Sequence, residues 1–229
     1  MAGQGARFGH QFKPFLMIGD EPFIAAAVKP FRAFADRIER LVFVYLAQQE
    51  REFAVRERLT AMFEGLPFET VLLDAPTRGP AETIGRAVQK LGAHGPAFVC
   101  DCDHALDVAP LFAVTEPYAA LLPVWPLAGE RVTSWSVARV DRDGCVHAIA
   151  EKQIPGGDSG TVMGVIGCYG FGNIGDIADR AEALHATNFS EVIAQLVTEG
   201  APVRAAQIER AMFFGDPERL ARAKELQYE

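Results

Sequence analysis

The chain has 229 residues, of which 49% are hydrophobic and 23% charged, and its formal net charge is −8 at pH 7. This length and composition are ordinary for a globular, soluble protein with one α/β domain, and the negative charge argues against nucleic acid as a partner, because a nucleic-acid groove requires a basic face. No apolar stretch approaches the length of a membrane span, no signal peptide is recognisable and the four cysteines form no disulfide pattern, so we expect a cytoplasmic protein without a membrane partner.

A segment with two glycines opens the chain, Met1-Ala2-Gly3-Gln4-Gly5-Ala6-Arg7-Phe8. Glycines allow successive backbone N–H groups to turn toward one anion, because no Cβ blocks close approach. Arg7, and Lys13 six residues later, add cationic donors for phosphate oxygens. The segment therefore predicts a triphosphate-binding loop, with a flexible N-terminus as the alternative. It fits neither a P-loop, because no Gly-Lys-Ser/Thr follows, nor a dinucleotide-binding fingerprint, because Phe8 stands at the third glycine position.

Strands and helices alternate through the first hundred residues. Hydrophobic periodicity and turn residues predict, in chain order, a helix over about 22–36, a strand over 41–46, a helix over 55–63, a strand over 68–73, a helix over 80–92 and a strand over 97–100. This alternation predicts an α/β fold in which a parallel sheet is joined by right-handed crossovers.

The second half of the chain has a different pattern. Its predicted elements are a strand over 135–140, a hairpin turn at 141–144, a strand over 145–149, an extended glycine-rich segment over 162–171, a helix over 188–200 and a last helix from Pro217. The hairpin depends on Asp141-Arg142-Asp143-Gly144, and the longer helix on the capping-box pattern of Asn188 and Glu191. The segment 112–126, which contains three prolines, is compatible with either a buried strand or an interface loop.

Two aspartates, in Asp101-Cys102-Asp103, directly follow the predicted strand 97–100. Ligands of open parallel sheets bind beyond the carboxyl ends of the strands. Carboxylates at that edge can hold Mg²⁺, a hard ion that prefers oxygen ligands and bridges phosphates. One alternative is an ordinary polar turn. Another is a zinc site of Cys100, Cys102 and His104, which lacks a fourth ligand nearby in the sequence.

Two further polar segments are candidates for binding. The segment 77–83, Thr-Arg-Gly-Pro-Ala-Glu-Thr, lies between a strand and a helix, so the backbone amides at the helix start point outward; a simple turn before a proline-initiated helix is the alternative. The pair Glu151-Lys152 follows the hairpin. Taken alone, such a pair is more often a solvated surface charge than a binding site.

The ordered set of motifs resembles the sugar-phosphate nucleotidyltransferase family, the nucleotide-diphospho-sugar pyrophosphorylases, over nearly the whole chain. The family signature Ala-Gly-x-Gly-x-Arg, a gap and Pro-Lys-Pro is similar to the N-terminal segment and Phe12-Lys13-Pro14. The resemblance implies an α/β, Rossmann-like nucleotidyltransferase fold, with a mostly parallel mixed sheet, helices on both faces and a small β-rich acceptor-binding part. It also implies a single domain over 1–229, with a nucleotide-binding half over 1–110 and an acceptor-binding half over 111–229.

The resemblance also implies roles for individual residues. The catalytic residues are Arg7, Lys13 and Asp103, and Asp103 with Asp101 would hold Mg²⁺. The nucleotide-binding residues are Ala2, Gly3, Gly5, Thr77, Gly79 and Ala81. The acceptor-binding residues are Glu151, Lys152, Gly167 and Tyr169, of which Lys152 would grip a phosphate.

The chain departs from the family pattern in several places. Phe12 replaces the first proline of Pro-Lys-Pro, and the gap before it is short. Phe213 stands where the family has the aspartate that is the second metal ligand, and Asp216 stands at a threonine position. The family's glycine loop follows a central strand, so we expect the true translation start to lie upstream of Met1, with that strand encoded before it.

The reaction implied by the resemblance is transfer of an NMP from an NTP to a phosphorylated small molecule, with Mg²⁺ as cofactor and release of pyrophosphate. A sugar 1-phosphate is the expected acceptor and an NDP-sugar the product. One alternative is a cytidylyltransferase that acts on a non-sugar phosphate for surface-polymer modification. Another is a catalytically silent nucleotide-binding regulatory protein. A homo-oligomer is compatible with either.

Overall fold

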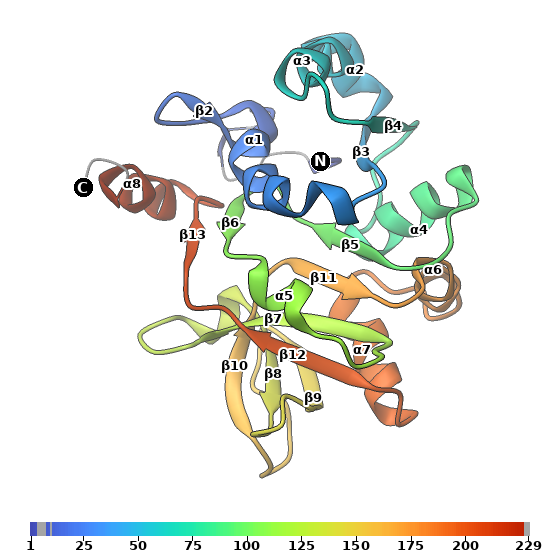
Figure 1. The fold of residues 1–229 in the computed structure, drawn as a ribbon, viewed down its shortest axis with the longest axis vertical. Coiled ribbons are helices and arrows are strands. Elements are labelled where there is room, and N and C mark those ends of the chain that lie inside the picture. The colour runs from blue at the N-terminus through green and yellow to red at the C-terminus, as the bar shows by residue number, and fades with distance from the viewer. Residues whose placement is uncertain (4–7, 10, 227–229) are drawn as a thin grey trace. The chain divides into compact units, whose positions relative to one another are not determined.

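The computed structural model describes residues 1–3, 8–9 and 11–226. It divides the chain into two compact units (Figure 1). The first unit comprises Met1–Thr77, Asp101–Asp107 and Arg210–Glu229, and the second comprises Arg78–Cys100 and Val108–Glu209. Each unit therefore contains segments that are distant in the sequence. The expected single domain, divided near residue 110, stays a prediction.

A parallel strand pair forms one part of the first unit. Strand β3 (Leu41–Leu46) pairs in register with β4 (Phe68–Leu73), and the chain between them forms α2 (Ala47–Phe53) and α3 (Val55–Met62). These bounds confirm both predicted strands. The last four residues of β3 are all buried, as expected for an apolar run of β-branched and aromatic residues that packs on both faces.

The remaining elements of the first unit come from the N-terminal segment, from a short segment near the middle of the chain and from the C-terminal segment. They are the 3-10 helix Lys13–Phe15, β1 (Met17–Ile18), β2 (Glu21–Pro22), α1 (Phe23–Val28), the 3-10 helix Lys29–Arg37, β6 (His104–Leu106), β13 (Ala211–Phe213) and α8 (Pro217–Leu226). The single helix expected over 22–36 is wrong. The α-helix ends at Val28 because Pro30 cannot donate an N–H and its ring opposes α-helical continuation.

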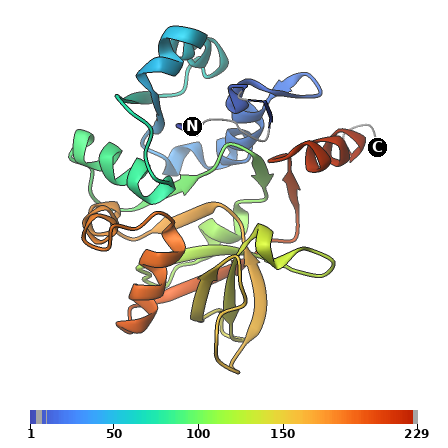
Figure 2. The same ribbon diagram turned by 180° about the vertical axis from the view of Figure 1, so that it is seen from behind.

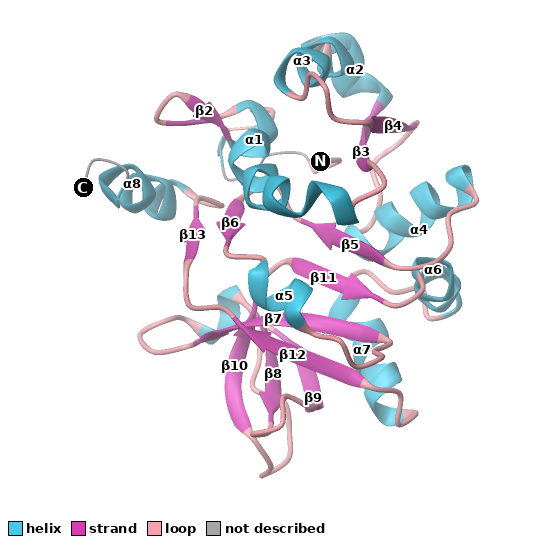
Figure 3. Cartoon of the chain, viewed as in Figure 1, coloured by secondary structure: helices cyan, strands magenta, loops and turns pink. Residues whose placement is uncertain are grey.

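A seven-stranded sheet forms the centre of the second unit (Figure 3). The strand order is β5 (Ala97–Cys100), β11 (Cys168–Phe171), β7 (Ala120–Pro126), β10 (Thr161–Val165), β8 (Ser136–Val140) and β9 (Val146–Glu151), and β12 (Val203–Gln207) pairs with β7. The ambiguous segment 112–126 therefore contains a buried central strand. Pro123 cannot donate to a ladder, but its carbonyl accepts from the Ile166 N–H at 2.9 Å.

The helices of the second unit are α4 (Pro80–Leu91), α5 (Ala109–Ala113), α6 (Ile174–Ala183) and α7 (Phe189–Thr198). Figure 2 shows α7 against the sheet, and its Phe189, Val192 and Ile193 belong to the same buried core as residues of β7, β8 and β9. The predicted capping box is present, with Glu191 accepting from the Asn188 N–H at 2.9 Å. Among the described residues, no helix is long and apolar enough to cross a membrane.

The predicted α/β class is confirmed, but the pairing of strands is less parallel than expected. Among the described residues, parallel ladders are β3–β4 and β7–β12, whereas the other ladders of the large sheet are antiparallel. The additional antiparallel pairing arises mainly in the second half of the chain, where short connections join consecutive strands. One example is the turn Asp141–Gly144 between β8 and β9. Short connections can join only antiparallel neighbours.

We predict that Leu122→Ala destabilises the protein by roughly 2–5 kcal/mol, because truncation of a buried leucine loses transfer energy and leaves a cavity. Leu122 is fully buried in β7. Urea unfolding followed by circular dichroism measures the change. Val42→Ala on the exposed side of β3 is the control and should cost much less. Equal losses for the two variants would contradict the central placement of β7.

Candidate functional site

Lys13 and Asp103 form an ion pair in the first unit. The Lys13 Nζ donates to Asp103 Oδ2, and the side chains are 23% and 22% exposed. Lys13 begins the 3-10 helix that Pro14 stabilises through its fixed φ, whereas Asp103 precedes β6. The fold therefore brings together two of the residues that sequence analysis proposed as catalytic.

The pKa values of Asp101 and Asp103 are shifted in opposite directions. Burial opposes ionisation of Asp103, but its hydrogen bond to His104 and the charge of Lys13 outweigh burial and lower the pKa of Asp103. Asp101 retains access to solvent, yet crowding by protein atoms and, next, the charge of Asp103 raise its pKa to about 6. Asp103 is therefore firmly ionised at neutral pH and is the stronger cation ligand of the two.

Gly215 is a residue of this site to which sequence analysis gave no role. A Cβ built at Gly215 would lie 2.6 Å from Asp103 Oδ2, so only glycine leaves the carboxylate in its observed position. The adjacent Phe214 N–H donates to the Asp103 carbonyl at 3.0 Å. The segment after β13 thus fixes both the backbone and the side-chain position of Asp103.

The residues around Asp103 suit a hard cation better than zinc. Cys100 Sγ lies 2.8 Å from Cys168 Sγ in the second unit, and burial raises the pKa of Cys102 to about 11, which disfavours the thiolate that zinc requires. Within the described residues, no three His, Cys, Asp or Glu side chains gather as a metal site. The zinc alternative has no support there. Asp103 and Asp101 offer oxygen donors that fit Mg²⁺ when phosphate oxygens and water complete its shell.

The departures at Phe213 and Asp216 have a structural explanation. Asp216 Oδ1 accepts from the Arg219 N–H at 2.9 Å, which caps the start of α8. Phe213 lies in β13 opposite His104, and the Arg219 guanidinium stands 5.6 Å from its ring centre. The contacts of Asp216 are those of a helix cap rather than a ligand.

The glycine segment is held through Gln49, which sequence analysis missed. Gln49 is buried, its Nε2 donates to the Gly3 carbonyl at 3.1 Å and its Oε1 accepts from the Leu46 N–H at 2.9 Å. Ala2 belongs to the first unit beside Gly3. Gly5 and Arg7, two of the predicted triphosphate-binding residues, lie outside the described residues. A buried glutamine at the third position of a helix gives no sequence signal for this role.

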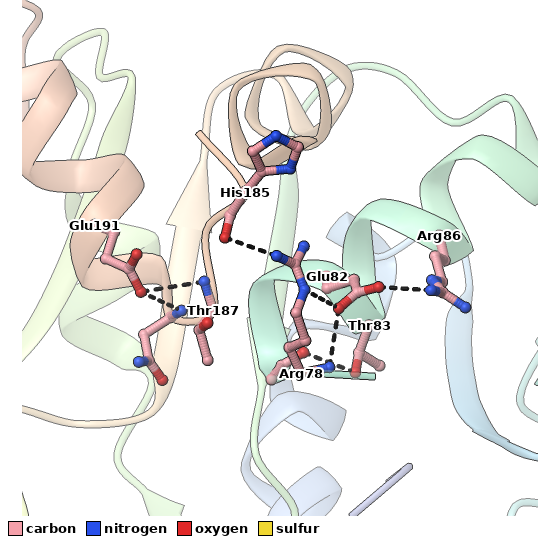
Figure 4. Close-up of polar contacts among 9 residues, drawn as sticks. Arg78, Glu82, Thr83, Arg86, His185, Thr187 and Glu191 are labelled. Carbon is pink, nitrogen blue, oxygen red and sulfur yellow. Dashed lines mark hydrogen bonds and ion pairs between the residues drawn. The ribbon is translucent and has the colours of Figure 1, made fainter. Parts of the chain in front are cut away.

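An ionic network organises the start of α4 in the second unit (Figure 4). Glu82 Oε2 accepts from the Arg78 backbone N–H at 2.9 Å and from its Nε at 2.8 Å, and Glu82 Oε1 accepts from Arg86 at 2.6 Å. The Arg78 guanidinium also donates to the His185 carbonyl at 3.2 Å. The Arg78 hydrogen bonds are the main reason that the pKa of Glu82 is lowered to about 2.

The predicted nucleotide-binding loop packs against Thr187. A Cβ at Gly79 would lie 2.4 Å from the Thr187 carbonyl oxygen, and the Ala81 N–H donates to that same oxygen at 3.1 Å. Ala81 is fully buried, and this hydrogen bond to Thr187 occupies its backbone N–H within the second unit. Thr77 ends the N-terminal segment of the first unit, and Arg78 begins the second unit. The loop is therefore held rigidly on its helical side.

Glu151 and Lys152 lie together at the end of β9. Glu151 Oε2 accepts from the Ser136 hydroxyl at 2.6 Å and from the Ser190 hydroxyl at 3.1 Å. The Lys152 Nζ is 4.0 Å from Glu151 Oε1 and its side chain is 61% exposed. Ser136 and Ser190 are partners that sequence analysis did not identify, because they are distant from Glu151 in the sequence.

The last two predicted acceptor-binding residues belong to the start of β11. Gly167 precedes the strand, and Tyr169 lies within it. The Tyr169 ring stacks on Phe171 with centres 6.1 Å apart and contacts Phe189 of α7 at 5.2 Å. Tyr169 is only partly buried, so part of this aromatic cluster faces solvent.

One family model matches about two thirds of the chain. Residues 1–151 match the model of the MobA-like NTP transferase domain. Among curated proteins, none matches the sequence significantly.

Several solved structures share the fold. The nucleoside-diphosphate-sugar pyrophosphorylase from Vibrio cholerae RC9 is 21% identical with a TM-score of 0.75, covering 98% of both chains. The UTP-bound UGPase from Acinetobacter baumannii is 18% identical with a TM-score of 0.76, covering 99% of this chain and 90% of that one. The inositol-1-phosphate CTP transferase from T. maritima is 14% identical with a TM-score of 0.74, covering 99% and 92%.

We predict that Glu82→Gln lowers the free energy of unfolding by on the order of 1 kcal/mol at pH 7, a modest value because its arginine partners are about half exposed. The folded-state pKa of Glu82 is depressed from 4.5 to about 2. Its contribution is therefore complete above pH 4.5 and is lost as the pH falls toward 2. Urea unfolding of both proteins at pH 7 and pH 3.5 measures this. A difference that grows on acidification would contradict the assignment.

Proposed function

Because the chain belongs to the MobA-like NTP transferase domain family, we propose that it transfers an NMP from an NTP to a phosphorylated small molecule and releases pyrophosphate. The proposed acceptor is a sugar 1-phosphate and the proposed product an NDP-sugar. The observation that carries the proposal is the pairing of Lys13 with Asp103, a cationic donor beside a carboxylate that stays ionised. Such a pair provides what phosphoryl chemistry requires, which is charge of both signs held in position.

Lys13 and Asp103 would have different roles in substrate binding. Lys13 would donate to the α-phosphate, and the Gly3 and Gly5 amides with Arg7 would bind the β- and γ-phosphates. Asp103 and Asp101 would hold Mg²⁺, which when bound supplies Lewis-acid stabilisation of charge on the α-phosphate. The pair keeps Asp103 ionised and places the two side chains beside each other before substrate binds, which limits the reorganisation that binding requires.

The nucleobase would be read by the segment 77–83. The Ala81 amide donates to Thr187, so base recognition would fall on Thr77 and Gly79 rather than on all three predicted residues. The close approach of Gly79 to Thr187 supports a loop whose position changes little when a base binds. Rigid loops lose less conformational entropy on binding than flexible ones.

The acceptor would be held in the second unit. Lys152 would donate to the acceptor phosphate, while Glu151, Gly167 and Tyr169 would line the acceptor pocket. The attacking phosphate oxygen is already anionic at neutral pH, so no general base is required. Positioning of the two phosphates would supply most of the rate enhancement.

A non-sugar phosphate acceptor is a second candidate. The inositol-1-phosphate CTP transferase from T. maritima has the same fold, and Phe213 stands where the family resemblance places a second metal ligand. A cytidylyltransferase used in surface-polymer modification would fit both observations. A panel of the four NTPs with sugar 1-phosphates, inositol phosphate and alditol phosphates, read by pyrophosphate release, distinguishes the two.

A silent nucleotide-binding protein is the outcome that would overturn the proposed activity. An NTP at about 100 times its dissociation constant adds about 2.7 kcal/mol of stability, which a thermal-shift assay detects. Stabilisation by an NTP with Mg²⁺, without pyrophosphate release for any acceptor of the panel, would establish that outcome. Pyrophosphate release with one acceptor would exclude it.

We predict that Lys13→Ala loses about 2–4 kcal/mol of transition-state stabilisation, comparable with the loss of an oxyanion donor. The measurement is kcat/KM for pyrophosphate release. Lys29→Ala is the matched control, because it removes the same charge from an exposed ion pair with Glu21. A Lys13→Ala variant within about threefold of the parent, less than 1 kcal/mol, would show that Lys13 does not have this role.

We predict that Gly215→Ala lowers kcat/KM by about tenfold or more, because the added Cβ displaces the Asp103 carboxylate from Lys13. A tenfold loss corresponds to ~1.4 kcal/mol of transition-state stabilisation. Separating this partly buried ion pair should also lower the free energy of unfolding, but the side chain of Asp103 can turn away, so we expect the variant to fold. Gly156→Ala is the control, since a Cβ there meets no atom within 4 Å. If Gly215→Ala unfolds the protein instead, its role is structural.

A further inference from the structure

The Glu151 carboxylate is held by two hydroxyl groups on different elements of the second unit. Ser136 donates from β8, where it is the direct cross-strand partner of Glu151. Ser190 donates from the first turn of α7. Both hydrogen bonds end on Oε2, at 2.6 and 3.1 Å. Oxygen Oε1 is the carboxylate oxygen nearest to Lys152.

Ser190, one of the two hydroxyl donors to Glu151, is only 2% exposed. A solvated surface glutamate would not have such a buried partner. The Ser190 helix is fixed by the capping box in which Glu191 accepts from the Thr187 and Asn188 N–H groups at 3.1 and 2.9 Å. The hydroxyl therefore has a defined position. Hydrogen bonds to an ionised acceptor are stronger than neutral ones, so Glu151 loses rotational freedom that an exposed glutamate would keep.

The backbone of Lys152 is also constrained. Its φ is +58°, in the left-handed region that non-glycine residues rarely adopt, and its N–H donates to the Trp135 carbonyl at 2.9 Å. Local strain of this kind persists only where the surrounding structure determines it. Trp135 and Ser136 are adjacent, so the same strand end holds the Lys152 backbone and the Glu151 side chain.

We propose that Ser136 and Ser190 are positioning residues that lock Glu151 so that its Oε1 orients the Lys152 ammonium toward the acceptor phosphate. This inference rests on the proposed function, in which Lys152 binds that phosphate. The serines touch no substrate. They fix one carboxylate oxygen, and the other oxygen then sets the direction of a flexible, largely exposed lysine.

The mechanism predicts a selective effect on the acceptor. Ser136→Ala and Ser190→Ala should each raise KM for the acceptor by about five- to twentyfold, less than the full loss of a hydrogen bond to a charged group, because the remaining serine still holds Glu151 Oε2. KM for the NTP should stay within about twofold, because the NTP contacts are elsewhere. Ser136→Thr keeps the hydroxyl on a residue that strands favour and should restore most of the acceptor affinity.

The experiment is steady-state kinetics of pyrophosphate release with the acceptor that the wild-type enzyme uses. Ser134→Ala is the matched control, because Ser134 is an exposed serine two residues away. A double-mutant cycle separates positioning from general packing: in a Glu151→Ala background, Ser136→Ala should have no further effect on acceptor KM. Thermal unfolding of each variant checks that the fold is retained.

The possible outcomes separate the inference from the proposed function. If Lys152→Ala raises acceptor KM but neither serine variant does, the inference is overturned and the function stands. If Ser136→Ala raises acceptor KM equally with and without Glu151, or raises both KM values together, the serines are structural and the inference is again overturned. If no phosphorylated acceptor supports pyrophosphate release, the function fails and the inference falls with it. The selective, Glu151-dependent effect supports both.

Discussion

The ion pair between Lys13 and Asp103 joins two segments that are 90 residues apart in the sequence. Both side chains are mostly removed from water, and a partly buried charge without a partner is costly. The pair therefore constrains the 3-10 helix at Lys13, the turn before β6 and, through Gly215, the end of β13. Three separate pieces of the first unit must meet around one carboxylate. In a protein whose net charge is −8, the pair holds a cationic side chain in place where we propose that polyphosphate binds.

Two carboxylates of the second unit are also held by polar partners. Glu151 is satisfied by hydroxyls from β8 and α7, and Glu82 by Arg78 and Arg86 at the start of α4. In each case an acidic side chain fixes a segment that carries a proposed binding residue, Lys152 in one and Gly79 in the other. These carboxylates organise loops rather than react, which is the usual task of residues that support a site.

Much of the local structure could be predicted from the sequence. Strands 41–46, 68–73 and 97–100 were predicted with the bounds that the structure has, because apolar runs bounded by turn residues are a local signal. The helix predicted over 22–36 is longer than α1, because Pro30 ends the α-helix at Val28. The excess of antiparallel ladders was also not expected. Pairing direction depends on how short the connections are, and the glycine-rich segment 162–171 did not reveal that it contains two strands.

By itself, the sequence determined the α/β class, the strands 41–46, 68–73 and 97–100 and the presence of Lys13 and Asp103 as charged candidates. Each of these depends on residues close together in the chain or on a motif with fixed spacing. Only the tertiary structure decided that Gln49 holds Gly3, that Gly215 leaves room for Asp103 and that Ser136 and Ser190 share one oxygen of Glu151. Such contacts join residues remote in sequence, and packing geometry rather than local propensity selects them.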